Sequence, residues 1–314
     1  MPRMADDFDE FSFLPAQAAD VGVDAPLPRG ERVSLTLPDG RTLSALRYVP
    51  AGTEDPPVVT FLHGAGLNAH TWDTTILALG LPALAIDLAG HGDSSWREDA
   101  AYLARVLAPD VIAALETWTD RPQVLVGQSL GALVAAAVAA SAPERVRDLV
   151  MIDITPGIDQ SAGPSQIRAF FAGPTDWASR EELVEKALAF GLGGSRDAAT
   201  RGVYLNSRVR DDGRVEWKHH FAHLAAAAAN APETEGGTDD ELTAVLSETG
   251  WDDLDAVSAP ITLIRGDHGY VTDADAGEFA RRVPAASLYV VPTGHNVQEE
   301  IPADLGRLLS GIAG

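Results

Sequence analysis

The stretch Val124-Leu-Val-Gly-Gln-Ser-Leu-Gly131 decides the fold of this chain. Its apolar start predicts a buried strand, and its end places Ser129 between two glycines, Gly127 and Gly131. Glycine permits a sharp strand-to-helix turn, because it brings no side chain into the bend. The alanine-rich run 132–140 favours the helix that this turn requires. The pattern therefore predicts a serine hydroxyl that projects from the tip of a tight turn.

The composition limits the classes of protein and of site that this chain can form. Its 314 residues are 46% apolar, which is enough to bury a large core in one or two domains. Lys and Arg number 23 and Asp and Glu number 46, so the formal charge is 23 − 46 = −23. A surface this acidic repels phosphate backbones and anionic membranes, which argues against a nucleic-acid partner. The chain has no cysteine, so disulfides, thiol nucleophiles and cysteine metal sites are excluded.

The N-terminal region and the hydropathy indicate where the protein works. Residues 1–20 are rich in acids and lack the basic start and the apolar run of a secretion signal. No stretch approaches the ~20 consecutive apolar residues of a membrane-spanning helix. We therefore expect a cytoplasmic protein with no membrane partner, and either a monomer or a homodimer is compatible with the sequence.

Short apolar runs alternate with helical stretches on both sides of Ser129. Each run ends in a polar or glycine-rich loop. The runs are 57–62, 84–86, 123–126, 149–152, 260–264 and 287–291. This rhythm predicts an α/β fold, in which helices cover both faces of a mainly parallel sheet. Ligands of such sheets bind at the carboxyl ends of the strands, where His63, Asp87, Ser129 and Asp153 all fall.

The chain divides into an arm, a core and an insertion. Residues 1–30 predict an extended arm that packs on the core through the rings of Phe8, Phe11 and Phe13. The α/β core is assigned to 31–155 and 250–314, and it begins with a hairpin around Pro38-Asp-Gly40 that should form one sheet edge. The insertion, 156–249, lacks the strand-helix rhythm and is interpreted as a helical cap, or lid. Its expected elements are helices at 165–171, 181–190, 197–205, 219–230 and 239–246, with a short hairpin turn at Asp211-Asp-Gly213.

A serine hydroxyl becomes a good nucleophile only beside a base that a third group holds in place. His295, in Pro292-Thr-Gly-His-Asn296, lies in the loop after the last expected strand. The carboxyl end of that strand is at the same sheet edge as Ser129. The order serine, acid, histidine along the chain also favours His295, which is therefore the predicted base.

Four motifs in order give the chain a resemblance to the α/β-hydrolase fold superfamily. They are His63-Gly64, the loop Asp87-Leu-Ala-Gly-His-Gly-Asp-Ser94, the elbow from Gly127 to Gly131, and Gly294-His295. The likeness covers the chain from about residue 31 to its end and is weakest in the insertion. It implies a mostly parallel eight-stranded sheet with an inserted helical cap, as in a capped serine esterase-like member. It also implies an oxyanion hole that the backbone N–H groups of Leu130 and Ala65 form.

The acid of the catalytic triad is the point at which this chain departs from the commonest family pattern. After the run 260–264 the family usually has Gly-x-x-Asp, with the aspartate three residues past the glycine. Here the matching residues are Gly266-Asp-His-Gly269, so a glycine stands at the expected carboxylate position. The usual assignment therefore does not transfer to this chain.

Two aspartates remain as candidates for the triad acid. Asp267 is two residues early, whereas Asp153 ends the strand that follows the nucleophile helix, 153 − 129 = 24 residues beyond Ser129. Asp273 and Asp275 instead suit the start of a helix. Because geometry and role identify a triad rather than sequence position, both candidates stay open, and Asp153 is the one that we favour.

Aromatic and basic side chains of the insertion are the candidates for substrate contacts. Rings would line a mainly apolar pocket, and an arginine could hold a substrate carboxylate. The named candidates are Trp177, Trp217, His219, His220 and Arg168, with Arg208, Arg210 and Lys218 as further cations. Asp87 and His91 are too few ligands for a metal ion, so neither a metal nor a cofactor is expected.

Together these features predict a serine hydrolase that cleaves a small or medium carboxylic ester through an acyl-enzyme, with a small-molecule ester as its partner. Aromatic and carboxylate-bearing monoesters are among the candidate substrates. Dehalogenation and epoxide opening need a carboxylate nucleophile and are excluded by Ser129. A lactonase, an amidase or a carbon-carbon bond hydrolase with the same triad remains open, as does a ligand-binding homologue without activity.

Overall fold

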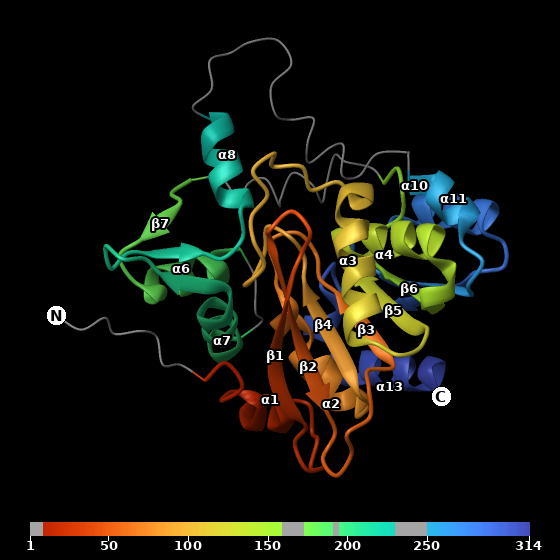
Figure 1. Cartoon of the computed structure of the whole chain (residues 1–314), viewed down its shortest axis with the longest axis horizontal. Helices are drawn as coiled ribbons and strands as arrows, with labels where there is room; N and C mark the ends of the chain where they lie inside the picture. Colours follow the sequence, from red (N-terminus) through yellow and green to blue (C-terminus); the bar gives the residue numbers. More distant parts are fainter. Residues whose placement is uncertain (1–8, 159–172, 191–194, 230–249) are drawn as a thin grey trace.

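The computed structural model describes residues 9–158, 173–190, 195–229 and 250–314. Its centre is an eight-stranded sheet of order β1-β2-β4-β3-β5-β6-β10-β11 (Figure 1). The edge hairpin of β1 (Arg29–Thr36) and β2 (Thr42–Val49) is antiparallel, and β2 also runs antiparallel to β4. The other neighbours pair in parallel: β3 (Val59–Leu62), β4 (Ala83–Asp87), β5 (Gln123–Gln128), β6 (Val146–Ile152), β10 (Ile261–Gly266) and β11 (Ser287–Val291). The predicted α/β fold and its edge hairpin are confirmed.

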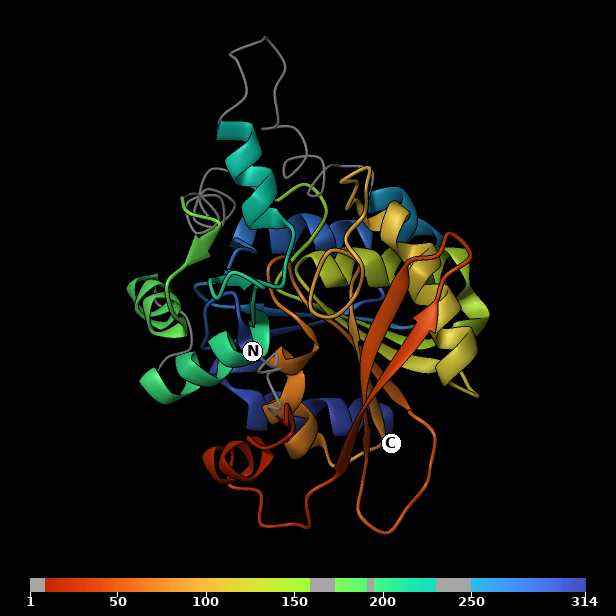
Figure 2. The same ribbon diagram turned by 60° about the vertical axis from the view of Figure 1, so that its left-hand side comes forward.

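Helices cover both faces of this sheet, as Figures 1 and 2 show. One face packs against α1 (Leu14–Asp20), η1 (Ala69–Trp72), α2 (Asp73–Leu79) and α13 (Pro302–Ala313). The other face packs against α3 (Ala104–Trp118), α4 (Leu130–Ser141), α10 (Gly250–Ala256) and α11 (Asp273–Arg282). Two short helices complete the core, η2 (Pro143–Arg145) and α12 (Val297–Glu300). No helix within the described ranges is long and apolar enough to cross a membrane.

The central strands are apolar throughout because their two faces belong to two different cores. Successive side chains of a strand point to opposite faces. In β5, Val124 and Val126 pack on the face that carries Trp72 and Leu309, whereas Leu125 packs on the face that carries α3 and α4. All of these side chains are buried. The sheet is therefore a rigid platform, and the polar residues that end its strands are held in register.

Two sequence-based boundaries differ from the structure. Part of the arm, which was expected to be extended, forms the helix α1. Pro15 in its first turn favours a helix start, and the side chains of Leu14 and Ala18 are buried against the core. The expected packing through Phe11 is present, since its ring lies 6.0 Å from that of Tyr48, while Phe8 lies outside the described residues. The sequence predicts a helix from about Asp99 to Trp118, but α3 begins only at Ala104, because Tyr102 is anchored to its surroundings through its hydroxyl.

The described part of the insertion forms helices and a second, small sheet on one side of the core (Figure 2). The helices are α6 (Arg180–Ala189), α7 (Arg196–Asn206) and α8 (Phe221–Ala229). The strands are β7 (Asp176–Trp177), β8 (Ser207–Val209) and β9 (Val215–Trp217), in the order β7-β9-β8. The hairpin turn expected at 211–213 joins β8 and β9. The helices expected at 165–171 and 239–246 lie outside the described residues, and the assignment of 156–249 as a cap stays a prediction.

Candidate active site

Ser129 occupies the sharp turn between β5 and α4. Its backbone has φ 54° and ψ −124°, a conformation that residues with side chains rarely adopt, and its side chain is almost completely buried. The two flanking glycines are required by close approach. A Cβ at Gly127 would lie 2.3 Å from Gly131 O, and a Cβ at Gly131 would lie 2.2 Å from Leu62 O. The turn is therefore strained and tightly packed, as a nucleophile elbow requires.

Asp153 and His295 meet at the neighbouring strand end. His295 Nδ1 lies 2.8 Å from Asp153 Oδ2, and the carboxylate is fully buried. Two backbone amides also donate to this carboxylate: Gly266 N to Oδ1 at 3.0 Å and Tyr270 N to Oδ2 at 2.6 Å. These donors satisfy both oxygens of the buried carboxylate. Because an ionised carboxylate can only accept, His295 Nδ1 carries the proton and Nε2 is left available as a base.

The glycine that replaces the usual family aspartate has a structural reason. A Cβ at Gly269 would lie 2.3 Å from both carboxylate oxygens of Asp153. The side chain of Asp153 thus fills the space beside Gly269, in the loop after β10, although it comes from the end of β6. The other candidate, Asp267, lies in the same loop but on the surface, where it pairs with His268 at 2.5 Å. The structure therefore brings Asp153, and not Asp267, into contact with His295.

Tyr270 is a neighbour of His295 that the sequence does not reveal. Its ring stacks on the imidazole with a centroid separation of 3.6 Å and an interplanar angle of 11°. Burial and the nearby Asp153 carboxylate raise the pKa of its phenol to about 12, so the ring is neutral near pH 7. The same residue thus holds the imidazole by its face and the carboxylate by its amide.

The loop 63–68, which we call the oxyanion loop, follows β3 and carries the predicted donor Ala65. His63 orients it: Leu88 N donates to Nε2 at 3.0 Å, so Nδ1 carries the proton and donates to Gly64 O at 2.8 Å. Burial lowers the pKa of His63 to about 4, which keeps this histidine neutral. The second predicted donor, Leu130, is the first residue of α4, where backbone N–H groups have no partner within the helix.

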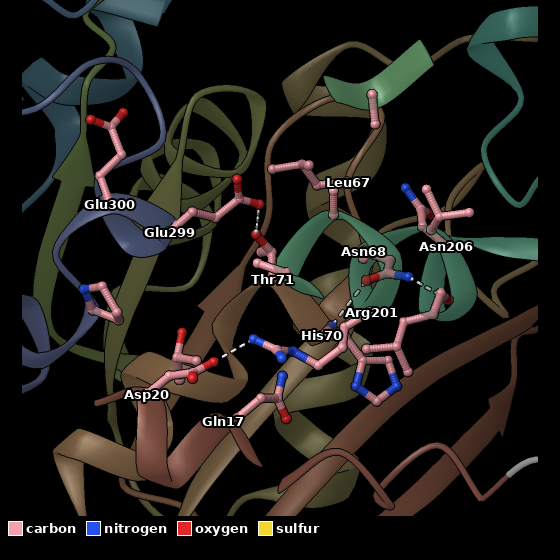
Figure 3. Close-up of a pocket in the computed structure, with 18 of the residues that line it drawn as sticks. Gln17, Asp20, Leu67, Asn68, His70, Thr71, Arg201, Asn206, Glu299 and Glu300 are labelled. Carbon is pink, nitrogen blue, oxygen red and sulfur yellow. Dashed lines mark hydrogen bonds and ion pairs between the residues drawn. The ribbon is translucent and has the colours of Figure 1, made fainter. Parts of the chain in front are cut away.

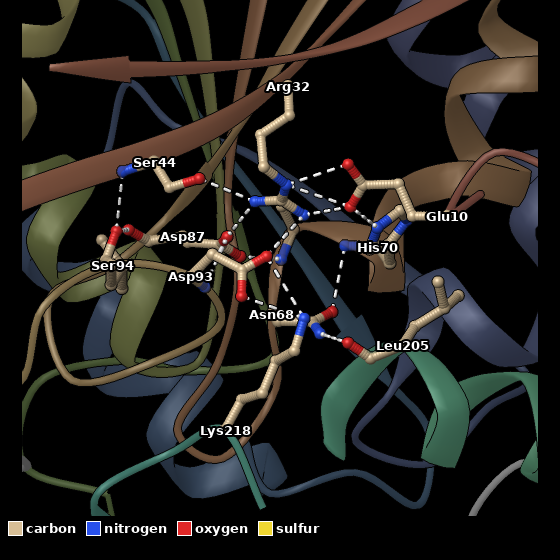
Figure 4. Close-up of polar contacts among 12 residues, drawn as sticks. Glu10, Arg32, Ser44, Asn68, His70, Asp87, Asp93, Ser94, Leu205 and Lys218 are labelled. Carbon is tan, nitrogen blue, oxygen red and sulfur yellow. Dashed lines mark hydrogen bonds and ion pairs between the residues drawn. The ribbon is translucent and has the colours of Figure 1, made fainter. Parts of the chain in front are cut away.

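A partly buried charge cluster supports the far end of the oxyanion loop (Figure 4). Arg32 of β1 donates to Asp87 at 2.8 Å and to Glu10 at 2.9 Å. Asp87 Oδ1 accepts from the amide of Ala69, which directly follows the oxyanion loop, at 2.8 Å. Both oxygens of Asp87 and Oε1 of Glu10 thus accept hydrogen bonds from protein donors. Sequence reasoning missed this cluster, because its members are far apart along the chain and share no motif.

The aromatic and basic candidates of the insertion do not gather at one place. Trp177 and Trp217 pack on each other, with ring centroids 6.1 Å apart, and belong to the hydrophobic core of the insertion. His219 is buried and stacks on Trp217, whereas His220 stacks on Trp96 of the core, and its Nδ1 lies 2.8 Å from the Tyr102 hydroxyl. Arg168 lies outside the described residues. The other cations form ion pairs: Arg208 with Glu216, Arg210 with Asp176 and Asp212, and Lys218 with Asp93.

A cavity of about 360 Å³ lies beside the candidate site (Figure 3). Its walls include α1, α7, Trp217 and the chain from Gly66 to Thr71. Ser129, Asp153 and His295 are not among its lining residues, although Glu300, which accepts a hydrogen bond from Gly294 N at 3.1 Å, is one of them. The cavity therefore borders the oxyanion loop at Gly66 to Asn68 without including the three candidate catalytic side chains.

Comparisons with known proteins agree with this fold. The model of the alpha/beta hydrolase family matches residues 61–307. The protein named Esterase Rv0045c, from Mycobacterium tuberculosis, is 36% identical over 312 residues, which cover 97% of this chain and 95% of the esterase. A solved structure of that esterase superposes with a TM-score of 0.80 and covers 98% of this chain and 99% of its own.

A more distant relative has a different named reaction. The 2-(acetamidomethylene)succinate hydrolase of Mesorhizobium japonicum is 28% identical, with 91% of this chain and 94% of the relative covered. The solved structure of an E-2-(acetamidomethylene)succinate hydrolase superposes with a TM-score of 0.74 at 21% identity, and it covers 90% of this chain and 98% of its own. That structural likeness bears on the fold alone.

Proposed function

The chain belongs to the alpha/beta hydrolase family, and on that premise we propose that it is a serine hydrolase that cleaves carboxylic esters. The observation that carries this proposal is the 2.8 Å contact between His295 Nδ1 and Asp153, at the strand ends beside the strained turn of Ser129. Similarity to an esterase over nearly the whole chain supports the ester as the bond that is cleaved. Ser129, His295 and Asp153 are the proposed triad.

The proposed reaction has two steps. His295 Nε2 takes the proton of the Ser129 hydroxyl as Oγ attacks the ester carbonyl, and the same proton then leaves with the alcohol. The amides of Leu130 and Ala65 stabilise the negative oxygen of each tetrahedral intermediate, an effect worth about 10²–10³ in rate for one such donor. Water attacks the acyl-enzyme, with His295 again as base, and releases the carboxylic acid. Asp153 stays ionised and holds the imidazolium.

We propose a neutral ester rather than a carboxylate-bearing one. The candidate cations Arg208, Arg210 and Lys218 are each engaged by acidic side chains, and the formal charge of the chain is −23. An anionic substrate would meet this negative field and would need a cation that is not already paired. The segment 156–249, as a cap, would supply the apolar walls that select the acyl or alcohol part.

A panel of p-nitrophenyl esters of increasing acyl length, run beside aromatic monoesters with a free carboxylate, tests the proposal. We expect turnover of the neutral esters, weak or no turnover of the charged ones, and loss of all turnover in Ser129→Ala and His295→Ala. Hydrolysis of none of the esters by the folded wild-type protein would contradict an esterase and favour a binding homologue. A preference for the charged esters would contradict the neutral substrate alone.

A further inference from the structure

We propose that Asn206, the last residue of α7, is a positioning residue for the oxyanion loop, so that the insertion helps to hold the oxyanion hole in shape. This inference rests on the proposed function, since it assigns a role toward the amide of Ala65. It concerns residues that neither the sequence motifs nor the predicted triad include. Asn206 acts through the loop backbone and does not touch the reacting atoms.

Two amide side chains, Asn68 and Asn206, connect the loop and α7 in opposite directions. Figure 3 labels both of them. Asn206 Nδ2 donates to Gly66 O at 2.8 Å, and Asn68 Nδ2 donates to Leu205 O at 2.9 Å. The carbonyl of Leu205 belongs to the last turn of α7, where carbonyl groups lack partners within the helix. Each hydrogen bond therefore satisfies a backbone carbonyl that has no other hydrogen-bond partner among residues 9–158 and 195–229.

The rest of the loop is held by the core. Within the described parts of the chain, His63 and Leu67 N bind Gly64 O, and Asp87 holds the amide of Ala69 just after the loop. Gly66, next to Ala65, has φ +79°, a backbone conformation that glycine adopts without steric strain. The bond from Asn206 is made to the carbonyl of this residue. Without it, the peptide between Gly66 and Leu67, two peptides after the one that carries Ala65 N–H, loses its hydrogen bond from Asn206.

The bonding of Asn206 is asymmetric in a way that favours positioning over mere attachment. Its Oδ1 is buried with no hydrogen-bond partner among the described residues, while Nδ2 is used on Gly66. Because Gly66 O can only accept, the amide cannot turn round to satisfy Oδ1. Burying an acceptor without a hydrogen-bond partner destabilises the folded protein. The protein tolerates that cost at a residue of α7 whose side chain donates to the loop.

Two substitutions remove the donor and keep the size of the side chain: Asn206→Leu and Asn206→Asp. With p-nitrophenyl butyrate we expect kcat to fall at least about tenfold while KM changes little, since a displaced oxyanion donor loses part of the 10²–10³ that one donor contributes. The second readout compares a trifluoromethyl ketone, which forms a tetrahedral oxyanion on the nucleophile, with the matching methyl ketone. The affinity ratio of the two should fall by the same factor as kcat.

Thr200→Val is the matched control, because the Thr200 hydroxyl bonds only Arg196 O within α7. We expect it to behave as the wild type in both assays. A thermal melt shows whether each Asn206 variant folds. If one of them does not, the test uses the other Asn206 variant together with Asn68→Leu, which removes the hydrogen bond from Asn68 to Leu205 O. An unchanged ketone ratio and unchanged kcat in the folded variants would overturn the inference. If the wild type hydrolyses no ester and binds no trifluoromethyl ketone, it is the proposed function that fails.

Discussion

Gly269 leaves the space that the Asp153 carboxylate fills. Asp153 itself has a positive φ of 47°, which a residue with a side chain adopts only when its surroundings demand it. The demand is visible in its partners, the amides of Gly266 and Tyr270 and the imidazole of His295. A carboxylate from β6 and a glycine after β10 are thus two halves of one arrangement, and changing either should disturb the other.

Gly269→Ala is expected to push the Asp153 carboxylate away from His295. The new Cβ would lie 2.3 Å from its oxygens, and a contact that short forces a movement of side chain or loop. We expect kcat/KM for a p-nitrophenyl ester to fall at least about tenfold, because the base loses its orienting partner. Gly277→Ala is the control, since nothing lies within 4 Å of a Cβ there and the residue is in α11. Equal activity of the two variants would refute the account of Gly269.

Asp153→Asn should lower kcat by about 10⁴, because the amide stabilises the wrong tautomer of His295 and cannot stabilise an imidazolium. The protein should still fold, since the asparagine has the same size. Asp267→Asn is the matched control and should retain nearly full activity, because Asp267 pairs with His268 on the surface. Steady-state kinetics and a thermal melt of both variants decide the matter. Loss of activity in Asp267→Asn, with Asp153→Asn active, would reverse the assignment.

Element α11 follows the loop that supplies Tyr270, and its start is fixed by a capping box. Thr272 Oγ1 accepts from Asp275 N, and the Asp275 carboxylate accepts from Thr272 N at 2.9 Å. The sequence predicted Asp273 and Asp275 as helix-start residues, and this is confirmed. This N-cap of α11 matters for the candidate site, because it fixes where the loop from Gly266 to Tyr270 ends.

Thr272→Ala is expected to destabilise the protein by about 1 kcal/mol, the usual contribution of an N-cap side chain. Thr117→Ala removes a hydroxyl that bonds a carbonyl inside α3, on the surface, and should change the free energy of unfolding by much less. Urea denaturation of both variants gives the comparison. Equal unfolding free energies for the two variants would show that the box does not secure the helix.

The elements that could be predicted from sequence are those with a local cause. The strands of the sheet carry continuous apolar runs, and the elbow needs its glycines, so both were predicted. The start of α3 and the helix in the arm were not, because they depend on contacts of Tyr102 and Leu14 with distant parts of the chain. At the site, motif order supplied Ser129 and His295 and geometry favoured Asp153. Tyr270 and Asn206 have no sequence signal, since their roles come from stacking and from a single amide hydrogen bond.

The partly buried charge cluster of Figure 4 joins the N-terminal arm to the core, because Glu10 of the arm pairs with Arg32 and His70. His70 lies between Glu10 and Asp73, with both ring nitrogens 3.0 Å from a carboxylate. Burial would lower the pKa of His70, but Asp73 and then Glu10 outweigh it and raise this pKa from 6.5 to about 9. Burial would raise the pKa of Glu10, but His70 and Arg32 outweigh it and lower this pKa from 4.5 to about 2. Both groups are therefore charged near pH 7.

These shifts predict how stability depends on pH. The contribution of His70 is full below pH 6.5 and is lost as the pH rises through about 9, because the unfolded chain gives up the proton first. The contribution of Glu10 is full above pH 4.5 and is lost as the pH falls through about 2. We measure the free energy of unfolding by denaturation from pH 3 to about 9. Near neutrality this free energy should be lower for Glu10→Gln than for the wild type, and it should decrease less as the pH is lowered. Glu54→Gln, at an exposed ion pair with Arg29, is the control. An identical pH profile for Glu10→Gln and the wild type would contradict the prediction.

The account as a whole depends on Ser129 being the nucleophile. Labelling with a fluorophosphonate, followed by intact mass and peptide mapping, tests this most directly, because the reagent forms a stable adduct only with an activated serine. We predict a single adduct per chain, located on Ser129 and absent from Ser129→Ala. A folded wild-type protein that takes up no label, or a label on another residue that persists in Ser129→Ala, would contradict it.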